Sequence, residues 1–274
     1  MKKEKRTVYF VSESTGITAE TLGSSLLSQF PHVDFDRIHM PFINTIERAA
    51  ELVVEFADVS GIQGHKPLVF STMPDKKINT MLETASCHYY ELFEGYLEKI
   101  GKDIGVMPER ESGLSHGLVN AEHYDTRIDT VNFALTHDDA MVTKSLHQAE
   151  VILVGVSRSG KTPTSLYLAL HFGIKVGNYP LTEDDFGVDD LPKVLIENKD
   201  KLIGLTIDPQ RLCEIREKRR PGSSYAALRT CQSEVRLAMA LFKRYHVSVL
   251  DASTRSIEEL ASQIVRVRGL TPHK

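Results

Sequence analysis

The sequence predicts an α/β fold built as two α/β domains, the first of which has a parallel sheet covered by helices. Strand-like runs and helical periodicity alternate along roughly the first hundred residues, and the alternation restarts near residue 147. Parallel strands need crossover helices between them, so this order of elements is typical of parallel sheets. The most loop-like stretch of the chain, 106–120, lies between the two series. We therefore expect domains at 1–105 and 147–274, joined by a loop and a helix at 106–146.

The N-terminal domain is expected to contain three strand–helix pairs followed by one further helix. Its strand segments are rich in β-branched and aromatic residues, and its helical segments carry apolar residues at helical spacing. Gly61 is expected to close the second helix. The expected strands are 7–14, 33–42 and 66–72, and the expected helices are 17–30, 45–61, 75–86 and 91–105.

The C-terminal series of elements begins with a helix that ends in a polar cluster. Pro209 suits the first position of a later helix, and the pair Pro221–Gly222 breaks the chain before a long helix. The expected helices are 120–140, 163–173, 191–200, 209–220, 223–246 and 256–268, and the expected strands are 150–156, 174–181, 201–208 and 247–253.

Composition places the chain among ordinary globular proteins. It has 274 residues, of which 41% are hydrophobic and 26% charged, enough for one large or two modest domains. The net charge of -4 argues against a general binder of nucleic acid or of anionic membranes. No apolar run approaches the ~18 residues of a membrane span, and no signal-peptide core is present, so we expect a cytoplasmic protein. Cys87, Cys213 and Cys231 have no metal-ligand or disulfide spacing and are expected to be small buried hydrophobic residues.

A phosphate-binding loop is the most specific motif of the sequence. An apolar run ends in G-x-x-x-x-G-K-T, and a helix is expected to begin near Lys161. In that context backbone N–H groups and the positive end of the helix point at a phosphate group. Lys161 would bridge the terminal phosphates, and the Thr162 hydroxyl would bind Mg²⁺. The alternative is a glycine-rich turn with a solvent-exposed lysine. The loop comprises Gly155, Val156, Ser157, Arg158, Ser159, Gly160, Lys161 and Thr162.

The expected site also needs an acid for the metal and cations for the transferred phosphoryl group. Asp208 ends the apolar run LIGLTI and is a candidate metal ligand, although it is equally placed to cap the helix that Pro209 begins. Four arginines around the Pro-Gly break resemble the arginine-bearing lid of a P-loop kinase, with a solvated basic helix face as the alternative. These arginines are Arg211, Arg216, Arg219 and Arg220. The C-terminal domain is accordingly expected to be a P-loop kinase-like α/β domain.

A second polar cluster, T-H-D-D, precedes the loop by fewer than twenty residues. We take His137, Asp138 and Asp139 as candidate catalytic residues, since adjacent carboxylates could bind magnesium or accept the proton of an attacking hydroxyl. The alternative is a helix end with capping carboxylates. A zinc site is not expected, because the nearby histidines lack metal-ligand spacing.

Taken together, several segments identify a family. VSESTGITAETLG, HYDTRIDTVNFALTHDD and ILVGVSRSGKTPTSLYLA, in this order, closely resemble the pyruvate, phosphate dikinase regulatory proteins of bacteria and plants. The closely related phosphoenolpyruvate synthetase regulatory proteins share these segments. The resemblance continues through GLTIDPQRL and DASTRSIEELA and so covers nearly the whole chain. Gly160 and Ala140 depart from the family pattern, and neither change removes a reactive group.

The resemblance implies a bifunctional regulatory enzyme. One activity is an ADP-dependent serine/threonine protein kinase that phosphorylates a threonine of pyruvate, phosphate dikinase and inactivates it. The other uses inorganic phosphate to remove that phosphoryl group, releases pyrophosphate and restores activity. ADP and phosphate would then be substrates, Mg²⁺ a cofactor, and the dikinase the protein partner. Arg158 would contact the transferred group, and a homodimer is the expected assembly.

Three other readings stay open at the level of the residues. The phosphoenolpyruvate synthetase could be the regulated target in place of the dikinase. A P-loop kinase of a small metabolite would carry the same loop, although the additional N-terminal domain favours a macromolecular substrate. A nucleotide sensor without turnover would not need both Lys161 and the Asp138–Asp139 pair.

Overall fold

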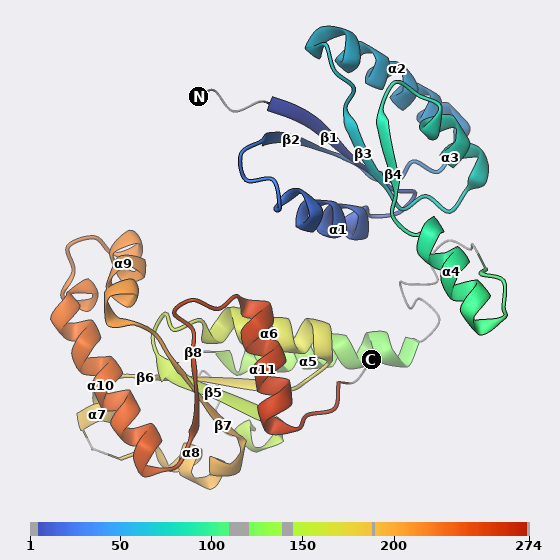
Figure 1. Ribbon diagram of the computed structural model, residues 1–274. Coiled ribbons are helices and arrows are strands. Elements are labelled where there is room, and N and C mark those ends of the chain that lie inside the picture. The colour runs from blue at the N-terminus through green and yellow to red at the C-terminus, as the bar shows by residue number, and fades with distance from the viewer. Residues whose placement is uncertain (1–4, 110–120, 139–144, 188–189, 273–274) are drawn as a thin grey trace. The chain divides into compact units, whose positions relative to one another are not determined.

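The structure, a computed structural model, describes residues 5–109, 121–138, 145–187 and 190–272, with only the backbone of 121–126 and 187. The chain divides into two compact units, Met1–Leu118 and Val119–Lys274 (Figure 1). This division differs from the expected one, because the described residues of the segment 106–146 are divided between the two units. Its helix belongs to the second unit, where it packs against the helix that follows the phosphate-binding loop.

The first unit is a four-stranded parallel sheet with the strand order β2-β1-β3-β4. Helix α1 covers one face of the sheet, and α2 and α3 cover the other (Figure 1). The expected parallel α/β unit is confirmed. Its elements are β1 (Lys5–Val11), α1 (Ile17–Leu27), β2 (Asp34–Met40), α2 (Ile46–Gln63), β3 (Leu68–Ser71), α3 (Lys76–Glu83), β4 (His88–Glu91) and α4 (Glu94–Ile104).

The second unit is also a four-stranded parallel sheet, with the strand order β6-β5-β7-β8. Strand β5, which precedes the phosphate-binding loop, lies between β6 and β7. The loop therefore begins at the carboxyl end of a central strand. The elements are α5 (Ala121–Thr136), β5 (Val151–Val156), α6 (Lys161–Phe172), β6 (Val176–Leu181), α7 (Glu183–Gly187), α8 (Lys193–Glu197), β7 (Leu202–Thr206), α9 (Pro209–Arg219), α10 (Leu228–Arg244), β8 (Ser248–Asp251) and α11 (Ile257–Arg268).

Three local expectations are corrected by the structure. Helix α2 continues past Gly61 and ends at Gly64, whose φ of 71° and N–H bond to the Ser60 carbonyl make it the helix terminator. Strand β4 was not expected, since it has only four residues and is defined by pairing with β3. Helix α10 begins at Leu228 rather than 223, because a short 3₁₀ turn over Ser224–Ala226 precedes it.

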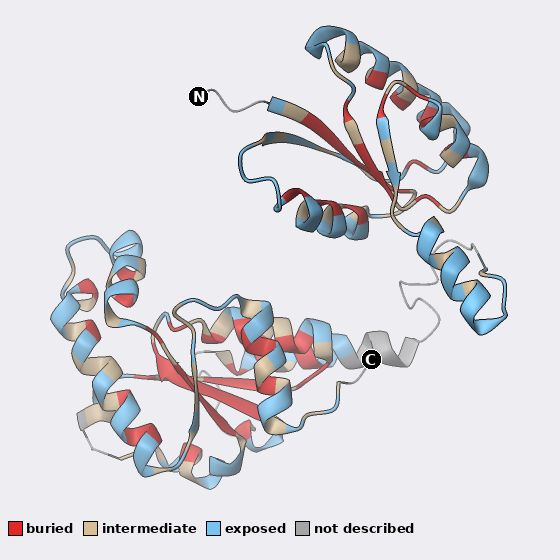
Figure 2. Cartoon of the chain, viewed as in Figure 1, coloured by how far each residue is buried: buried red, intermediate tan, exposed pale blue. Residues whose placement is uncertain are grey.

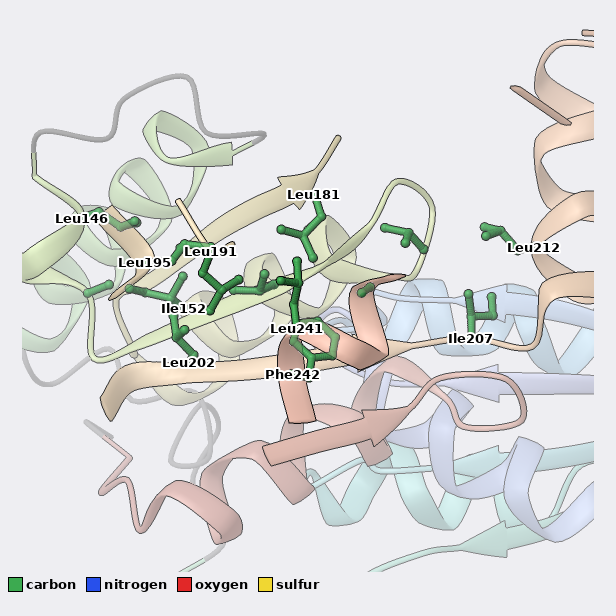
Figure 3. Close-up of a cluster of buried hydrophobic side chains, with 14 of the residues drawn as sticks. Leu146, Ile152, Leu181, Leu191, Leu195, Leu202, Ile207, Leu212, Leu241 and Phe242 are labelled. Carbon is green, nitrogen blue, oxygen red and sulfur yellow. The ribbon is translucent and has the colours of Figure 1, made fainter. Parts of the chain in front are cut away.

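The core of the second unit lies on both faces of β5. Val151 and Leu153 pack toward α6 and α11, while Ile152, Val154 and Val156 pack toward α8 and α10. All of these side chains are buried (Figure 2), and Figure 3 shows the cluster on the α8 and α10 side. A strand buried on both faces explains the continuous apolar run in its sequence. It anchors the start of the phosphate-binding loop rigidly in the core.

Two further expectations concern the cysteines and the membrane. Cys87 and Cys231 are buried, as expected, whereas Cys213 is half-buried at the edge of the core. Burial raises the pKa of the Cys87 thiol to about 11, so it stays protonated at neutral pH. None of the helices in the described part of the chain has the length and apolar character needed to cross a bilayer.

Candidate active site

The phosphate-binding loop joins β5 to α6 by a tight turn. Strand β5 ends at Val156, and α6 begins at Lys161. Arg158 and Gly160 have φ angles of 73° and 91°, so both lie in the left-handed region. Glycine adopts this conformation freely, whereas it is uncommon for an arginine, and such backbone strain is concentrated at functional sites. The N-terminus of α6, where the positive end of the helix dipole lies, therefore follows the loop directly.

Gly155 is required by the close approach of β5 to β7. A Cβ atom at this position would lie 2.4 Å from the Leu205 carbonyl oxygen and 2.9 Å from Ser159 Oγ. The first of these atoms belongs to the backbone of the neighbouring strand and cannot move away cheaply. The second glycine of the motif, Gly160, has open space where a Cβ atom would lie, and glycine suits it because of its φ angle.

We expect Gly155→Ala to lower the free energy of unfolding by about 1–3 kcal/mol, because the methyl group forces β5 and β7 apart. Urea unfolding followed by circular dichroism measures the change. Gly61→Ala is the matched control: nothing lies within 4 Å of the new methyl group, and the helix interior favours alanine. Equal stabilities of Gly155→Ala and the wild type would contradict the close approach.

A cavity of about 610 Å³ opens over the loop. Four cationic side chains line it: Arg158, Lys161, Arg219 and Arg220. Asp138 is the one carboxylate among the described residues of its lining. Such an excess of positive charge suits a ligand with several phosphate groups. The remaining lining residues are Ser157, Gly160, Thr162, Pro163, Ile215 and Tyr225.

Lys161 lies in the cavity wall as the sequence predicts. It is 3% exposed, and its Nζ donates to the Val156 carbonyl oxygen at 2.8 Å. The ammonium group is thereby held across the loop, between the end of β5 and the start of α6. A buried, directed cation at this place is well suited to phosphate oxygens, and the alternative of a solvent-exposed lysine is excluded.

Asp138 is brought to the loop from the end of α5. The Thr162 hydroxyl donates to Asp138 Oδ1 at 2.8 Å, although the two residues are 24 positions apart in sequence. The structure therefore unites the acidic cluster with the phosphate-binding loop. Asp139, the second acid of the pair, lies outside the described residues.

The structure does not bring His137 into the cavity. Its side chain is 3% exposed and stacks on the Phe133 ring, with centroids 3.8 Å apart. Nδ1 lies 2.8 Å from the Phe133 carbonyl oxygen, and Nε2 lies 2.7 Å from Ser145 Oγ. In the neutral ring Nδ1–H donates to the carbonyl, and Nε2 accepts from the serine hydroxyl. Both nitrogens are thus used within the fold, which favours a structural role over the expected catalytic one.

Asp208 is likewise placed away from the cavity. Its carboxylate accepts hydrogen bonds from the backbone N–H groups of Gln210 and Arg211, at 2.9 and 3.0 Å. These bonds cap α9, which was the alternative interpretation of this residue. The structure therefore does not unite Asp208 with Thr162 as a metal site. Asp138 occupies the position beside the threonine instead.

The four predicted lid arginines divide into different roles. Arg219 and Arg220 line the cavity, whereas Arg211 is exposed and does not. Arg216 is fully buried, and its Nη2 lies 2.6 Å from Glu234 Oε2 and donates to the Ser157 carbonyl oxygen at 3.1 Å. Burial by itself lowers the pKa of Arg216, but the hydrogen bond and charge of Glu234, with smaller contributions from Tyr225 and Cys231, together raise the pKa above its ordinary value. Arg216 therefore ties α9 and α10 to the loop.

Two site residues were missed by sequence reasoning. Tyr225, just after the Pro-Gly break, lines the cavity, and its hydroxyl lies 2.8 Å from Ser157 Oγ. Its ring also covers the Arg216 guanidinium, 4.1 Å from the centroid. Asn178, on β6, donates to both Asp138 and Thr162. A polar asparagine inside an otherwise apolar strand was the signal that could have revealed it.

Known proteins are similar in sequence to this chain along nearly its whole length. A family model described as kinase/pyrophosphorylase matches residues 8–265. A protein of Thiocapsa roseopersicina is 50% identical over 98% of this chain and 99% of its own length. One of Acinetobacter baylyi is 46% identical over 97% and 96%, and one of Ralstonia nicotianae is 45% identical over 95% and 93%. All three are named as phosphoenolpyruvate synthase regulatory proteins.

The family model and the geometry of the loop agree. A cationic cavity above a phosphate-binding loop, with a carboxylate beside the loop threonine, is what phosphoryl transfer needs. The match covers both units of the chain, so it extends beyond the loop itself. The chain belongs to the kinase/pyrophosphorylase family, a family of phosphotransfer enzymes.

Proposed function

We propose that this protein regulates phosphoenolpyruvate synthase by reversible phosphorylation. In one direction it is an ADP-dependent serine/threonine protein kinase that inactivates its target. In the other it transfers the phosphoryl group from the target to inorganic phosphate, forming pyrophosphate. The names of the relatives favour the synthase over pyruvate, phosphate dikinase, the target that the sequence first suggested. The expected homodimer stays a prediction.

The observation that carries the proposal is the hydrogen bond between Thr162 and Asp138 within a cationic cavity. Asp138 is a carboxylate that can accept a proton, and this bond holds it beside the phosphate-binding loop, which supports a role toward an acceptor hydroxyl. A nucleotide sensor needs the cationic groups alone, whereas transfer to a hydroxyl also needs the acid. This arrangement therefore favours turnover over mere binding.

In the kinase direction the β-phosphoryl group of ADP passes to the threonine hydroxyl of the target. The bond between the β-phosphorus and the bridging oxygen breaks, AMP leaves, and Asp138 accepts the hydroxyl proton. Lys161 and the N-terminus of α6 stabilise the charge on the phosphate oxygens. Arg158, Arg219 and Arg220 line the same cavity and orient the transferred group.

In the phosphorolysis direction an oxygen of inorganic phosphate attacks the phosphorus of the phosphothreonine. The bond to the threonine oxygen breaks, pyrophosphate forms, and Asp138 returns a proton to the departing oxygen. Inorganic phosphate is already an anionic nucleophile and needs no strong base. The surplus of cations in the cavity lowers the repulsion between the two phosphate groups.

Magnesium fits the residues that are present. Asp138 and Thr162 supply a carboxylate and a hydroxyl with oxygens 2.8 Å apart, and hard oxygen ligands are those that Mg²⁺ prefers. When bound there, the ion would neutralise charge on the phosphates of the nucleotide. Asp208, the other candidate ligand, would not take part because it caps α9.

The test is transfer of label from ADP carrying ³²P in the β-phosphate. The purified protein is incubated with phosphoenolpyruvate synthase, or with pyruvate, phosphate dikinase, and ATP labelled in the γ-phosphate is compared as donor. We expect label on the synthase from ADP, and its release as pyrophosphate when unlabelled phosphate is added. Label on the dikinase alone would reverse the choice of target. Label on a small molecule would indicate a metabolite kinase, and nucleotide binding without transfer would indicate a sensor.

A further inference from the structure

A buried asparagine, Asn178, contacts both Asp138 and Thr162 of the candidate active site. Asn178 is 1% exposed and does not line the cavity. Its Nδ2 donates to Asp138 Oδ1 and, at 3.0 Å, to Thr162 Oγ1. The Thr162 hydroxyl in turn donates to the same carboxylate oxygen. Side chains from β6, α6 and the end of α5 are thus joined in a closed ring of hydrogen bonds.

The backbone of Asn178 makes a second contact with the segment that carries Asp138. Its N–H donates to the His137 carbonyl oxygen at 3.0 Å, one residue before Asp138. The ring of His137 is itself held by Phe133 and Ser145. The carboxylate is therefore fixed through its own oxygen and through the peptide that precedes it. Both contacts come from β6, which is paired with the P-loop strand along its length.

The orientation of the Asn178 amide leaves one of its polar atoms without a hydrogen bond. Its Oδ1 is buried and has no hydrogen-bond partner. A buried acceptor without a partner is unfavourable, and few occur in folded proteins. Turning the amide over would place Oδ1 against the Asp138 carboxylate, with two acceptors facing each other. The NH₂ group therefore faces the acid and the threonine, at the expense of its own oxygen.

We infer that Asn178 is a positioning residue for phosphoryl transfer. It fixes Asp138 Oδ1 and the Thr162 hydroxyl in place, which leaves Oδ2 of Asp138 to act on the acceptor hydroxyl. Reaction rates are sensitive to displacements of a catalytic group by about 1 Å, so a support of this kind affects turnover more than binding. This role rests on the proposed function, since it presumes that the site transfers a phosphoryl group.

Two substitutions that keep the branched shape and the number of side-chain heavy atoms test the inference. Asn178→Asp replaces the NH₂ donor with a second carboxyl group against Asp138, and Asn178→Leu removes the donors without adding an ionisable group. Both variants keep the backbone N–H bond to His137. We expect kcat with labelled ADP to fall about 10–100-fold in each, while KM for ADP changes by about twofold or less. The nucleotide phosphates are still held by Lys161 and the loop.

Thr130→Val is the matched control. Thr130 is a buried polar residue of the same unit, its hydroxyl donates to the Arg127 and Ala169 carbonyl oxygens, and it lies outside the cavity lining. We expect it to lower stability and leave kcat unchanged. Wild-type kcat in either folded Asn178 variant would overturn the inference. A change in KM for ADP as large as the change in kcat would also overturn it. An inactive wild-type protein would overturn the proposed function and this role with it.

Discussion

Lys161→Ala is expected to lower kcat by roughly 10²–10³-fold in both the kinase and the phosphorolysis reaction. The ammonium group is buried in the cavity wall and is held across the loop by the Val156 carbonyl, so its position is set before any phosphate arrives. Preorganised charge of this kind needs no rearrangement during the reaction, which makes it more effective than a mobile lysine. Initial rates with labelled ADP and with the phosphorylated target measure the two reactions separately.

The fall of kcat in both the kinase and the phosphorolysis reaction is the informative part of this result. A single cavity serves both reactions in the proposed function, and Lys161 is common to them. The folded state of the variant is checked by circular dichroism, and Thr130→Val again provides a control with altered packing and an intact cavity. If folded Lys161→Ala kept either reaction at the wild-type rate, a mechanism with one phosphate-binding loop for both would be refuted.

Glu234→Ala is expected to destabilise the second unit by about 3–5 kcal/mol, because it leaves the Arg216 guanidinium buried without a counter-charge. The two side chains are 0% and 13% exposed, so the guanidinium has little access to solvent in place of the lost carboxylate. Arg216 Nη1 also donates to the Tyr225 carbonyl oxygen at 3.0 Å, and Nη2 donates to that of Ser157. Loss of the pair therefore also loosens the connection between the α9–α10 segment and the loop.

Urea unfolding followed by circular dichroism measures this destabilisation, since the chain has no tryptophan for fluorescence. The exposed pair Lys193–Glu197 supplies the control: its side chains are 91% and 59% exposed. Glu197→Ala should cost about 0.5 kcal/mol or less. The double variant Arg216→Met/Glu234→Leu should recover much of the stability, because no charge stays buried. Equal effects of Glu234→Ala and Glu197→Ala would show that the pair is not buried in solution.

The architecture of the site shows which parts local sequence can determine. The phosphate-binding loop and its flanking strand and helix depend on residues close together in sequence, and they were predictable within two or three residues. The cluster at Asp138 was recognisable as polar from the sequence, but its contact with Thr162 was not. Asp208, two residues after β7, satisfied the pattern of a metal ligand equally well, and only the fold shows that its carboxylate caps α9.

The sequence by itself determined the α/β class, the parallel sheet of the first unit, the phosphate-binding loop and the family, because these depend on local periodicity and on short motifs. Only the tertiary structure decided which distant side chains meet. It placed Asp138 rather than Asp208 beside Thr162, added Asn178 from β6, and separated Arg216 from the two arginines that line the cavity. Spacing along the chain cannot encode these contacts, since they arise from the order of strands in the sheet and from the packing of helices against it.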